Sequence, residues 1–192
     1  MIHKISICVY CGSKTGRDPA NAATAGALGT LLAARGIRMV YGGGSIGLMG
    51  ITARAAMAGG GHVVGIITEH IDVMEAGLRD LSVRHVEATM HARKMRMFEM
   101  SDAFIALPGG SGTLDEIAEI LSWQQLGLHH KPAVLMNDTG YWDPLIHMLH
   151  KMHDEGYLNQ TGRDYFHLAY SPDEALDYIA QHAKRKIDVP AS

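Results

Sequence analysis

A glycine-rich run that ends in a carboxylate is the part of this 192-residue sequence whose residue types and spacing could do chemistry. Residues 108–116 read Pro-Gly-Gly-Ser-Gly-Thr-Leu-Asp-Glu and stand between a predicted strand and a predicted helix. Such a turn exposes backbone N–H groups, and the dipole of the following helix adds positive potential, so an anion such as phosphate is the natural ligand. Glu116 would then lie one helical turn from the phosphate, where a carboxylate can orient water or stabilise positive charge developing at a ribose carbon.

The same run also has a purely structural explanation. Thr113 and Glu116 match a capping box, in which the threonine caps a backbone N–H of the first turn and the glutamate reaches back to the N–H of the cap. The glycines could likewise serve only to make a tight turn. The sequence leaves both explanations of Glu116 open.

A second glycine-rich run, residues 42–50, also follows a predicted strand and opens a helix. Gly42, Gly44 and Gly47 satisfy the G-x-G-x-x-G pattern, and Glu69 stands 22 residues after Gly47, as in a dinucleotide-binding fingerprint. The run follows the second strand rather than the first, however, and the chain has little room for a substrate domain. An NAD-dependent dehydrogenase is therefore the weaker interpretation.

Cations open the helix that precedes the strand leading to residues 108–116. Residues 90–97 read Met-His-Ala-Arg-Lys-Met-Arg-Met. Arg93 and Lys94 stand near a helix start, against the preference of the helix dipole, which indicates that they serve an external anion. The planar fork of arginine suits a phosphate or a carboxylate. A solvated basic face is the alternative.

Two further sets of side chains resemble metal or redox motifs without matching them. Cys8 and Cys11 form a C-x-x-C, but on a strand residues three apart point to opposite faces, beyond disulfide or shared-metal reach. His147, His150 and His153 recur every three residues, which spreads them around the helix and favours a solvated or partner-facing stripe. We predict ordinary strand cysteines and no metal site.

Charge and hydropathy exclude other classes of protein. The 17 Lys+Arg residues are balanced by 20 Asp+Glu, which gives a net charge of −3 and disfavours a nucleic-acid surface. Apolar stretches fall short of the roughly 20 residues that a membrane span needs. The apolar start, residues 1–11, reads into a Gly-Ser turn without a cleavage site, so we interpret it as a first strand of a cytoplasmic protein.

Short apolar runs alternate with longer amphipathic segments, and this alternation predicts the elements that position the glycine loops. We predict a single Rossmann-like, doubly wound α/β domain over residues 1–184, with a mostly parallel sheet, helices on both faces and a polar tail at 185–192. In such a sheet the loops after the strands emerge at the carboxyl edge, where ligands bind. Residues 68–82 fit no element, and a short helix or a mobile flap are both open. The predicted strands are 4–11, 37–42, 62–67, 83–87, 102–107 and 132–136, and the predicted helices are 19–35, 46–58, 91–100, 113–126, 141–154 and 172–184.

Residues 90–94 and 108–116 resemble the M-H-x-R-K and P-G-G-x-G-T-x-x-E motifs of the LOG ("Lonely guy") family of cytokinin riboside 5′-monophosphate phosphoribohydrolases, long mislabelled as lysine decarboxylases. The resemblance covers roughly residues 4–160. It implies hydrolysis of the N-glycosidic bond of an N6-substituted AMP to free base and ribose 5-phosphate, without a cofactor. It also implies that the chain assembles as a homodimer or a larger oligomer, of which we expect the homodimer. It also implies that Arg93 and Glu116 are catalytic. The substrate-binding residues it implies, with neighbouring loop residues, are Gly12, Ser13, Gly43, Gly44, Ser45, Met90, Lys94, Pro108, Gly109, Gly110, Ser111, Gly112 and Thr113.

The sequence departs from the family pattern at Thr68, where a proline is common, and at Asn21, where an aromatic residue is common. Both positions could shape the pocket for the base. A nucleotide or molybdenum-cofactor carrier is the alternative function, since a carrier needs the phosphate cradle but not the carboxylate. True lysine decarboxylation would require pyridoxal phosphate on Lys94 or Lys131.

Overall fold

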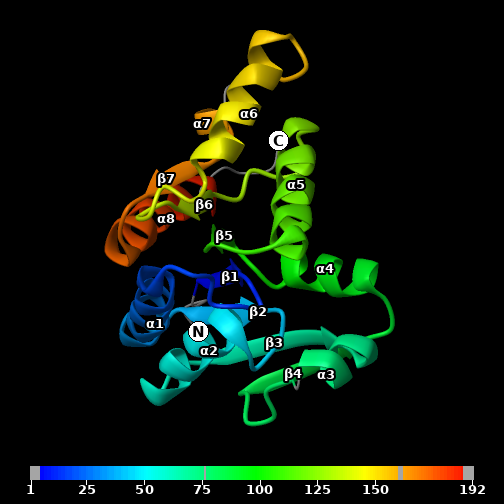
Figure 1. Cartoon of the computed structure of the whole chain (residues 1–192), viewed down its shortest axis with the longest axis vertical. Coiled ribbons are helices and arrows are strands. Elements are labelled where there is room, and N and C mark those ends of the chain that lie inside the picture. The colour runs from blue at the N-terminus through cyan, green and yellow to red at the C-terminus, as the bar shows by residue number, and fades with distance from the viewer. Residues whose placement is uncertain (1–4, 76, 160–161, 188–192) are drawn as a thin grey trace.

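A parallel β-sheet organises the computed structural model, which describes residues 5–75, 77–159 and 162–187 (Figure 1). The order of its strands is β4-β3-β2-β1-β5-β6-β7, and each neighbouring pair is parallel. The sheet therefore grows in both directions from β1, as in a doubly wound fold. The strands are β1 (Ser6–Tyr10), β2 (Arg38–Tyr41), β3 (Val63–Thr68), β4 (Val83–Glu87), β5 (Ala103–Ala106), β6 (Ala133–Met136) and β7 (His167–Ala169).

Helices cover both faces of the sheet (Figure 1). One buried cluster joins the sheet to α1, α2 and α8, and the other joins it to α4, α5 and α6. The helices are α1 (Pro19–Ala34), α2 (Gly47–Ala58), α3 (Glu69–Glu75), α4 (Met90–Glu99), α5 (Ser111–Gln125), α6 (Asp143–Asp154), α7 (Gly162–Tyr165) and α8 (Pro172–Ile187).

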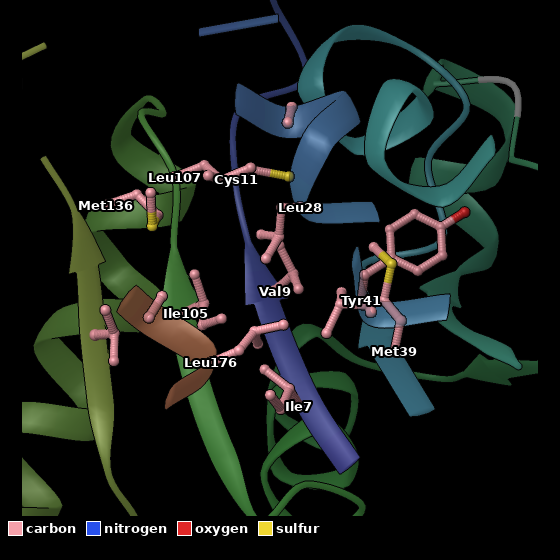
Figure 2. Close-up of a cluster of buried hydrophobic side chains, with 14 of the residues drawn as sticks. Ile7, Val9, Cys11, Leu28, Met39, Tyr41, Ile105, Leu107, Met136 and Leu176 are labelled. Carbon is pink, nitrogen blue, oxygen red and sulfur yellow. The ribbon is translucent and has the colours of Figure 1, made fainter. Parts of the chain in front are cut away.

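The two faces of β1 show why this strand lies at the centre. Ile7 and Val9 point into the first cluster, beside Leu28 of α1 and Leu176 of α8 (Figure 2). Cys8 points into the other cluster, because successive side chains of a strand alternate between faces. Cys11 lies in the first cluster, and neither cysteine takes part in a disulfide bond. The prediction of two ordinary cysteines on opposite faces is therefore confirmed.

The predicted fold class is confirmed, and the predicted strands and helices lie within about three residues of the observed ends. The sequence missed β7, which has only three residues, and the four-residue α7. The unassigned segment 68–82 contains α3, which Thr68 helps to begin by accepting a hydrogen bond from the Ile71 N–H at 3.4 Å. Helix α8 continues to Ile187, so residues 185–187 are helical rather than part of a tail, and residues 188–192 lie outside the described residues.

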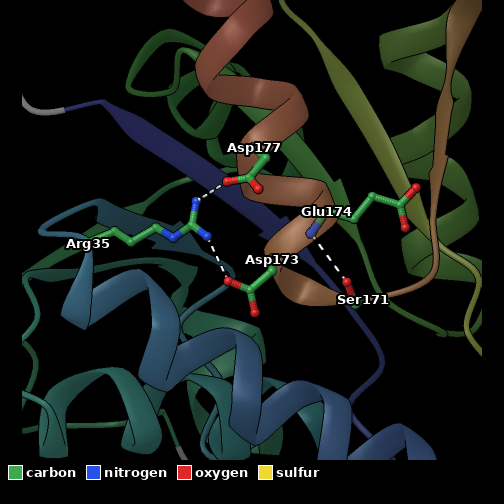
Figure 3. A network of polar contacts seen from close by, with 5 residues as sticks. All are labelled: Arg35, Ser171, Asp173, Glu174 and Asp177. Carbon is green, nitrogen blue, oxygen red and sulfur yellow. Dashed lines mark hydrogen bonds and ion pairs between the residues drawn. The ribbon is translucent and has the colours of Figure 1, made fainter.

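The last helix is attached to the first by a cluster of charges (Figure 3). Arg35, just after α1, contacts Asp173 at 2.7 Å and Asp177 at 2.5 Å, both on α8. Ser171 accepts a hydrogen bond from the backbone N–H of Glu174 at 3.3 Å, which caps the start of α8. Within the described residues, none of the helices combines the length and the apolar character needed to cross a membrane.

Candidate active site

The candidate site lies where the direction of the sheet reverses, between β1 and β5. Their loops meet there, because the Gly12 N–H donates a hydrogen bond to the Pro108 carbonyl at 3.1 Å. Two cavities of about 260 and 290 Å³ open beside this contact, and both are lined by Gly12, Ser13 and Gly110. The loops that follow β1 and β5 thus meet at the carboxyl edge of the sheet, as the sequence predicts.

Arg93 and Glu116 face each other in the wall of the first cavity. Arg93 comes from α4 and Glu116 from α5, and the Arg93 Nη1 lies 3.5 Å from the Glu116 Oε1. Their side chains are only 7% and 11% exposed. Further predicted residues in this wall are Gly12, Ser13, Met90, Gly110, Ser111, Gly112 and Thr113.

Backbone carbonyls hold the guanidinium of Arg93 in place. Its Nε donates to the Ile66 carbonyl at 2.9 Å, and its Nη2 donates to the Gly42 carbonyl at 3.2 Å. A Cβ at Gly42 would lie 2.1 Å from Nη2, so only glycine permits this approach. With two nitrogens engaged by the ends of β3 and β2, Nη1 is the nitrogen that faces Glu116.

The Glu116 carboxyl has an unusual affinity for protons. Burial raises its pKa from 4.5 to about 7, and the nearby Asp115 adds to the rise, while Arg93 and Lys94 oppose it. The 3.5 Å separation from Arg93 explains why the ion pair does not cancel the cost of burial. Near neutral pH this carboxyl can therefore both accept and release a proton.

Lys94 does not line either cavity. Its Nζ lies 3.0 Å from Asp115 Oδ2 and 3.2 Å from Glu119 Oε1, so it links α4 to α5 next to Glu116. The interpretation of Lys94 as a ligand for an external anion therefore finds no support in its contacts.

The start of α5 is not a capping box, which was the structural alternative that the sequence left open for Thr113 and Glu116. The helix begins at Ser111 with Gly110 as its N-cap, two residues earlier than predicted, and no side chain caps it. Thr113 is thus the third helical residue, and its hydroxyl packs against Gly109, where a Cβ would lie 2.1 Å from Oγ1. Glu116 faces Arg93 instead of a cap. The N–H groups of the first turn, which have no partner inside a helix, lie at the cavity.

The run at residues 42–50 is used differently. Two N–H groups in the first turn of α2, those of Leu48 and Met49, donate to the Gly12 carbonyl at 3.1 and 3.4 Å. Gly47 has φ +58°, and a Cβ there would lie 2.2 Å from the Ser13 backbone. A protein carbonyl thus occupies the place that a dinucleotide pyrophosphate would take. Gly42 lines the first cavity, whereas Gly43, Gly44 and Ser45 lie outside both cavity walls.

Several lining residues escaped the sequence reasoning. Tyr10, Met49, Ile71 and Met97 line the first cavity, and Ile71 belongs to the segment that was unassigned. The second cavity contains Pro108 and Gly109, as predicted, and Asn21, which the sequence had singled out as a position that could shape the pocket for the base. Residues from three other places in the chain were not predicted, and these are Lys14, Thr15 and Gly16, then Leu48, then Tyr141.

Tyr141 is the most informative of these residues. Its hydroxyl donates a hydrogen bond to the Gly109 carbonyl at 2.5 Å, although the two residues are 32 positions apart. A tyrosine directly after the turn glycine Gly140, at the carboxyl end of β6, is the signal that could have found it, because that loop also opens at the ligand edge.

The histidine stripe lies away from this site, on α6. His147 is exposed, and His153 lies 3.5 Å from Asp154. Among the residues that the structure describes, no group of three His, Cys, Asp or Glu side chains could hold a metal ion.

The fold and site define a class: a Rossmann-like α/β protein with an open helix N-terminus and a buried Arg–Glu pair at its switch point. The family model described as "Possible lysine decarboxylase" matches residues 49–179. The chain is 43% identical over 182 residues to the cytokinin riboside 5′-monophosphate phosphoribohydrolase LOG1 of Arabidopsis thaliana, covering 93% of this chain and 85% of that protein. It is 42% identical over 182 residues to the probable phosphoribohydrolase LOGL2 of Oryza sativa subsp. japonica, covering 93% and 75%. The chain belongs to the LOG family.

Solved structures share the fold at lower sequence identity. The Moco carrier protein of Chlamydomonas reinhardtii matches with a TM-score of 0.73 and 22% identity, over 95% of this chain and 99% of that one. The molybdenum cofactor binding protein of Rippkaea orientalis matches with a TM-score of 0.69 and 24% identity, over 94% and 98%. At these identities the likeness concerns the fold alone.

Proposed function

We propose that this chain is a phosphoribohydrolase that cleaves the N-glycosidic bond of cytokinin riboside 5′-monophosphates, releasing the N6-substituted adenine and ribose 5-phosphate. The observation that carries the proposal is the buried Arg93–Glu116 pair one helical turn from the open N-terminus of α5, in the wall of one cavity. The names of the plant relatives support the same substrate class.

The first turn of α5 is the place for the 5′-phosphate. Gly110 and Gly112 have no atom within 4 Å of the position of an added Cβ, so neither packing nor a positive φ demands glycine there. Space and backbone N–H groups together fit an anion. A helical turn rises 5.4 Å, which puts Glu116 within the reach of a ribose whose phosphate is held at Gly112.

Water supplies the incoming oxygen in this reaction. The bond from C1′ of the ribose to N9 of the base breaks with its electron pair leaving on the base, and a bond from C1′ to the water oxygen forms. Glu116 stabilises the positively charged ribose and accepts the proton of the water, while Arg93 positions Glu116. The base takes its proton from solvent. Only one carboxylate takes part, unlike the pair used by ordinary glycosidases.

The reaction needs no cofactor, and the lysines fit pyridoxal phosphate poorly. Lys94 is engaged by two carboxylates, and the Lys131 Nζ donates to the Phe98 carbonyl at 2.7 Å and lies over the Phe98 ring. Neither lines a cavity beside the glycine loops. A molybdenum-cofactor carrier would need the cradle alone, and the buried carboxylate favours the hydrolase.

A homodimer and a cytoplasmic location belong to the same proposal. Met90, which lines the first cavity, and Leu114, which follows the lining residue Thr113, are large apolar side chains that remain exposed, and a second copy of the chain would cover them. The apolar residues Ser6–Tyr10 form the central strand β1.

The decisive experiment incubates the protein with AMP and with N6-isopentenyl-AMP and follows the free base by chromatography. We expect Glu116→Gln to lower kcat at least about 100-fold with a nearly unchanged KM, because glutamine keeps the shape and loses the charge. Glu155→Gln is the matched control, since Glu155 is an exposed partner of Lys151. Absence of base release by the wild-type protein would refute the function, and an active Glu116→Gln variant would refute the role of this carboxylate.

A further inference from the structure

The loop proposed to bind phosphate contains one peptide unit, that between Gly109 and Gly110, whose orientation is not fixed by the conformational preferences of its two residues. The peptide between Gly109 and Gly110 rotates about the ψ of one glycine and the φ of the next, and glycine is the residue with the widest range of both. Gly110 adopts φ −92° and ψ −156° at the N-cap of α5. Something outside the loop must therefore select the orientation of this peptide.

Residues of two neighbouring loops donate hydrogen bonds to successive carbonyls of the glycine loop, those of Pro108 and Gly109. The Gly12 N–H bonds to the Pro108 carbonyl at 3.1 Å, and the Tyr141 hydroxyl bonds to the Gly109 carbonyl at 2.5 Å. A trans peptide is planar, so its N–H points opposite to its C=O. The contact with Tyr141 thus turns the N–H of Gly110 away from Tyr141, and Gly110 lines the first cavity as well as the second.

The backbone beside Tyr141 is fixed by the next residue, Trp142, although the Tyr141 side chain is exposed. The neighbouring Trp142 donates its backbone N–H to the Asn137 side chain at 2.8 Å and its indole N–H to the Ala106 carbonyl at 3.3 Å. The rings of Tyr141 and Trp142 meet edge to face at 4.9 Å. Trp142 is buried in the core, so it anchors the backbone directly beside Tyr141, whose own side chain is 45% exposed.

We propose that Tyr141 is a positioning residue: its hydroxyl holds the Gly109–Gly110 peptide so that the Gly110 N–H is aimed at the 5′-phosphate of the substrate. The inference rests on the proposed function. It assigns to Tyr141 the preference for a nucleotide over a nucleoside, because a substrate without a phosphate gains nothing from the orientation of this N–H.

The test is Tyr141→Phe, which removes the hydroxyl and keeps the ring. With N6-isopentenyl-AMP we expect KM to rise about tenfold while kcat changes less than about twofold. In a Glu116→Gln background, in which turnover is slowed at least about 100-fold, calorimetry should show AMP binding about tenfold weaker and adenosine binding unchanged. Tyr157→Phe is the matched control, because Tyr157 is 78% exposed and lines neither cavity.

Two outcomes would overturn the proposal: AMP affinity within twofold of the parent, or equal losses for AMP and adenosine. If adenosine binds too weakly to measure, the change in AMP affinity by itself decides whether the proposal stands. Because binding is measured separately from turnover, a protein that binds AMP but never releases base would refute the proposed function and leave the role of Tyr141 standing.

Discussion

The two glycine-rich loops of this protein look alike in sequence and behave differently in the fold. At residues 42–47 the protein itself fills the helix start, because the Gly12 carbonyl accepts the hydrogen bonds of Leu48 and Met49. At residues 108–113 the helix begins at Ser111, after the N-cap Gly110, without a side-chain cap and faces a cavity. A glycine-rich turn before a helix thus marks a possible anion site, and only its tertiary neighbours decide whether the site is available.

The surroundings of the glycines also differ between the two loops. In the first loop Gly42 and Gly47 are required by close approach, one to the Arg93 guanidinium and one to the Ser13 backbone. In the second loop Gly110 and Gly112 face open space. The first loop uses glycine to pack the protein, and the second leaves room for a ligand.

Gly47→Ala tests the packed loop and should have the largest effect. The residue has φ +58°, and a Cβ would lie 2.2 to 2.5 Å from backbone atoms of Ser13 and Lys14 that cannot move aside. We expect the free energy of unfolding in urea to fall by about 3 kcal/mol. Gly60→Ala, at φ +74° with no neighbour within 4 Å, isolates the dihedral strain and should cost about 1 kcal/mol. Equal losses in the two variants would contradict the packing explanation.

The pH dependence of stability tests the carboxylate beside the open loop. Folding raises the pKa of Glu116 from 4.5 to about 7, so the folded state disfavours the ionised form, and this cost grows as the pH rises through that interval. Glutamine does not titrate. The stability of Glu116→Gln relative to the wild-type protein should therefore improve by about 2 kcal/mol between pH 5.5 and pH 8.5. A difference that does not vary with pH would show that this carboxyl has an ordinary pKa.

Gly112→Ala tests the open loop and should have the smallest effect on stability. An added Cβ meets no atom within 4 Å, and alanine favours a helix, so the free energy of unfolding should stay within about 0.5 kcal/mol of the wild-type value. The methyl group would instead occupy ligand space, and AMP binding in a Glu116→Gln background should weaken about tenfold. Unchanged AMP affinity would place the phosphate elsewhere.

Much of the fold and part of the candidate site followed from the sequence. Alternating apolar and amphipathic segments predicted the parallel sheet, and the last predicted helix begins at residue 172, as α8 does. The short β7 escaped, because three residues carry no periodicity. The sequence could not decide between a capping box and a functional carboxylate, because Thr113 and Glu116 have the spacing of a capping box. In the structure the helix begins before Thr113, and burial against Arg93 determines where the carboxylate points.

By itself the sequence determined the order of the elements and which loops carry glycines, because both follow from local residue types. The tertiary structure decided which loop stays open, that Lys94 links two helices, and that Tyr141 reaches Gly109. It also decided the protonation of Glu116, since burial is a property of the whole packed molecule. These features depend on contacts between residues far apart in the chain, which no local pattern encodes.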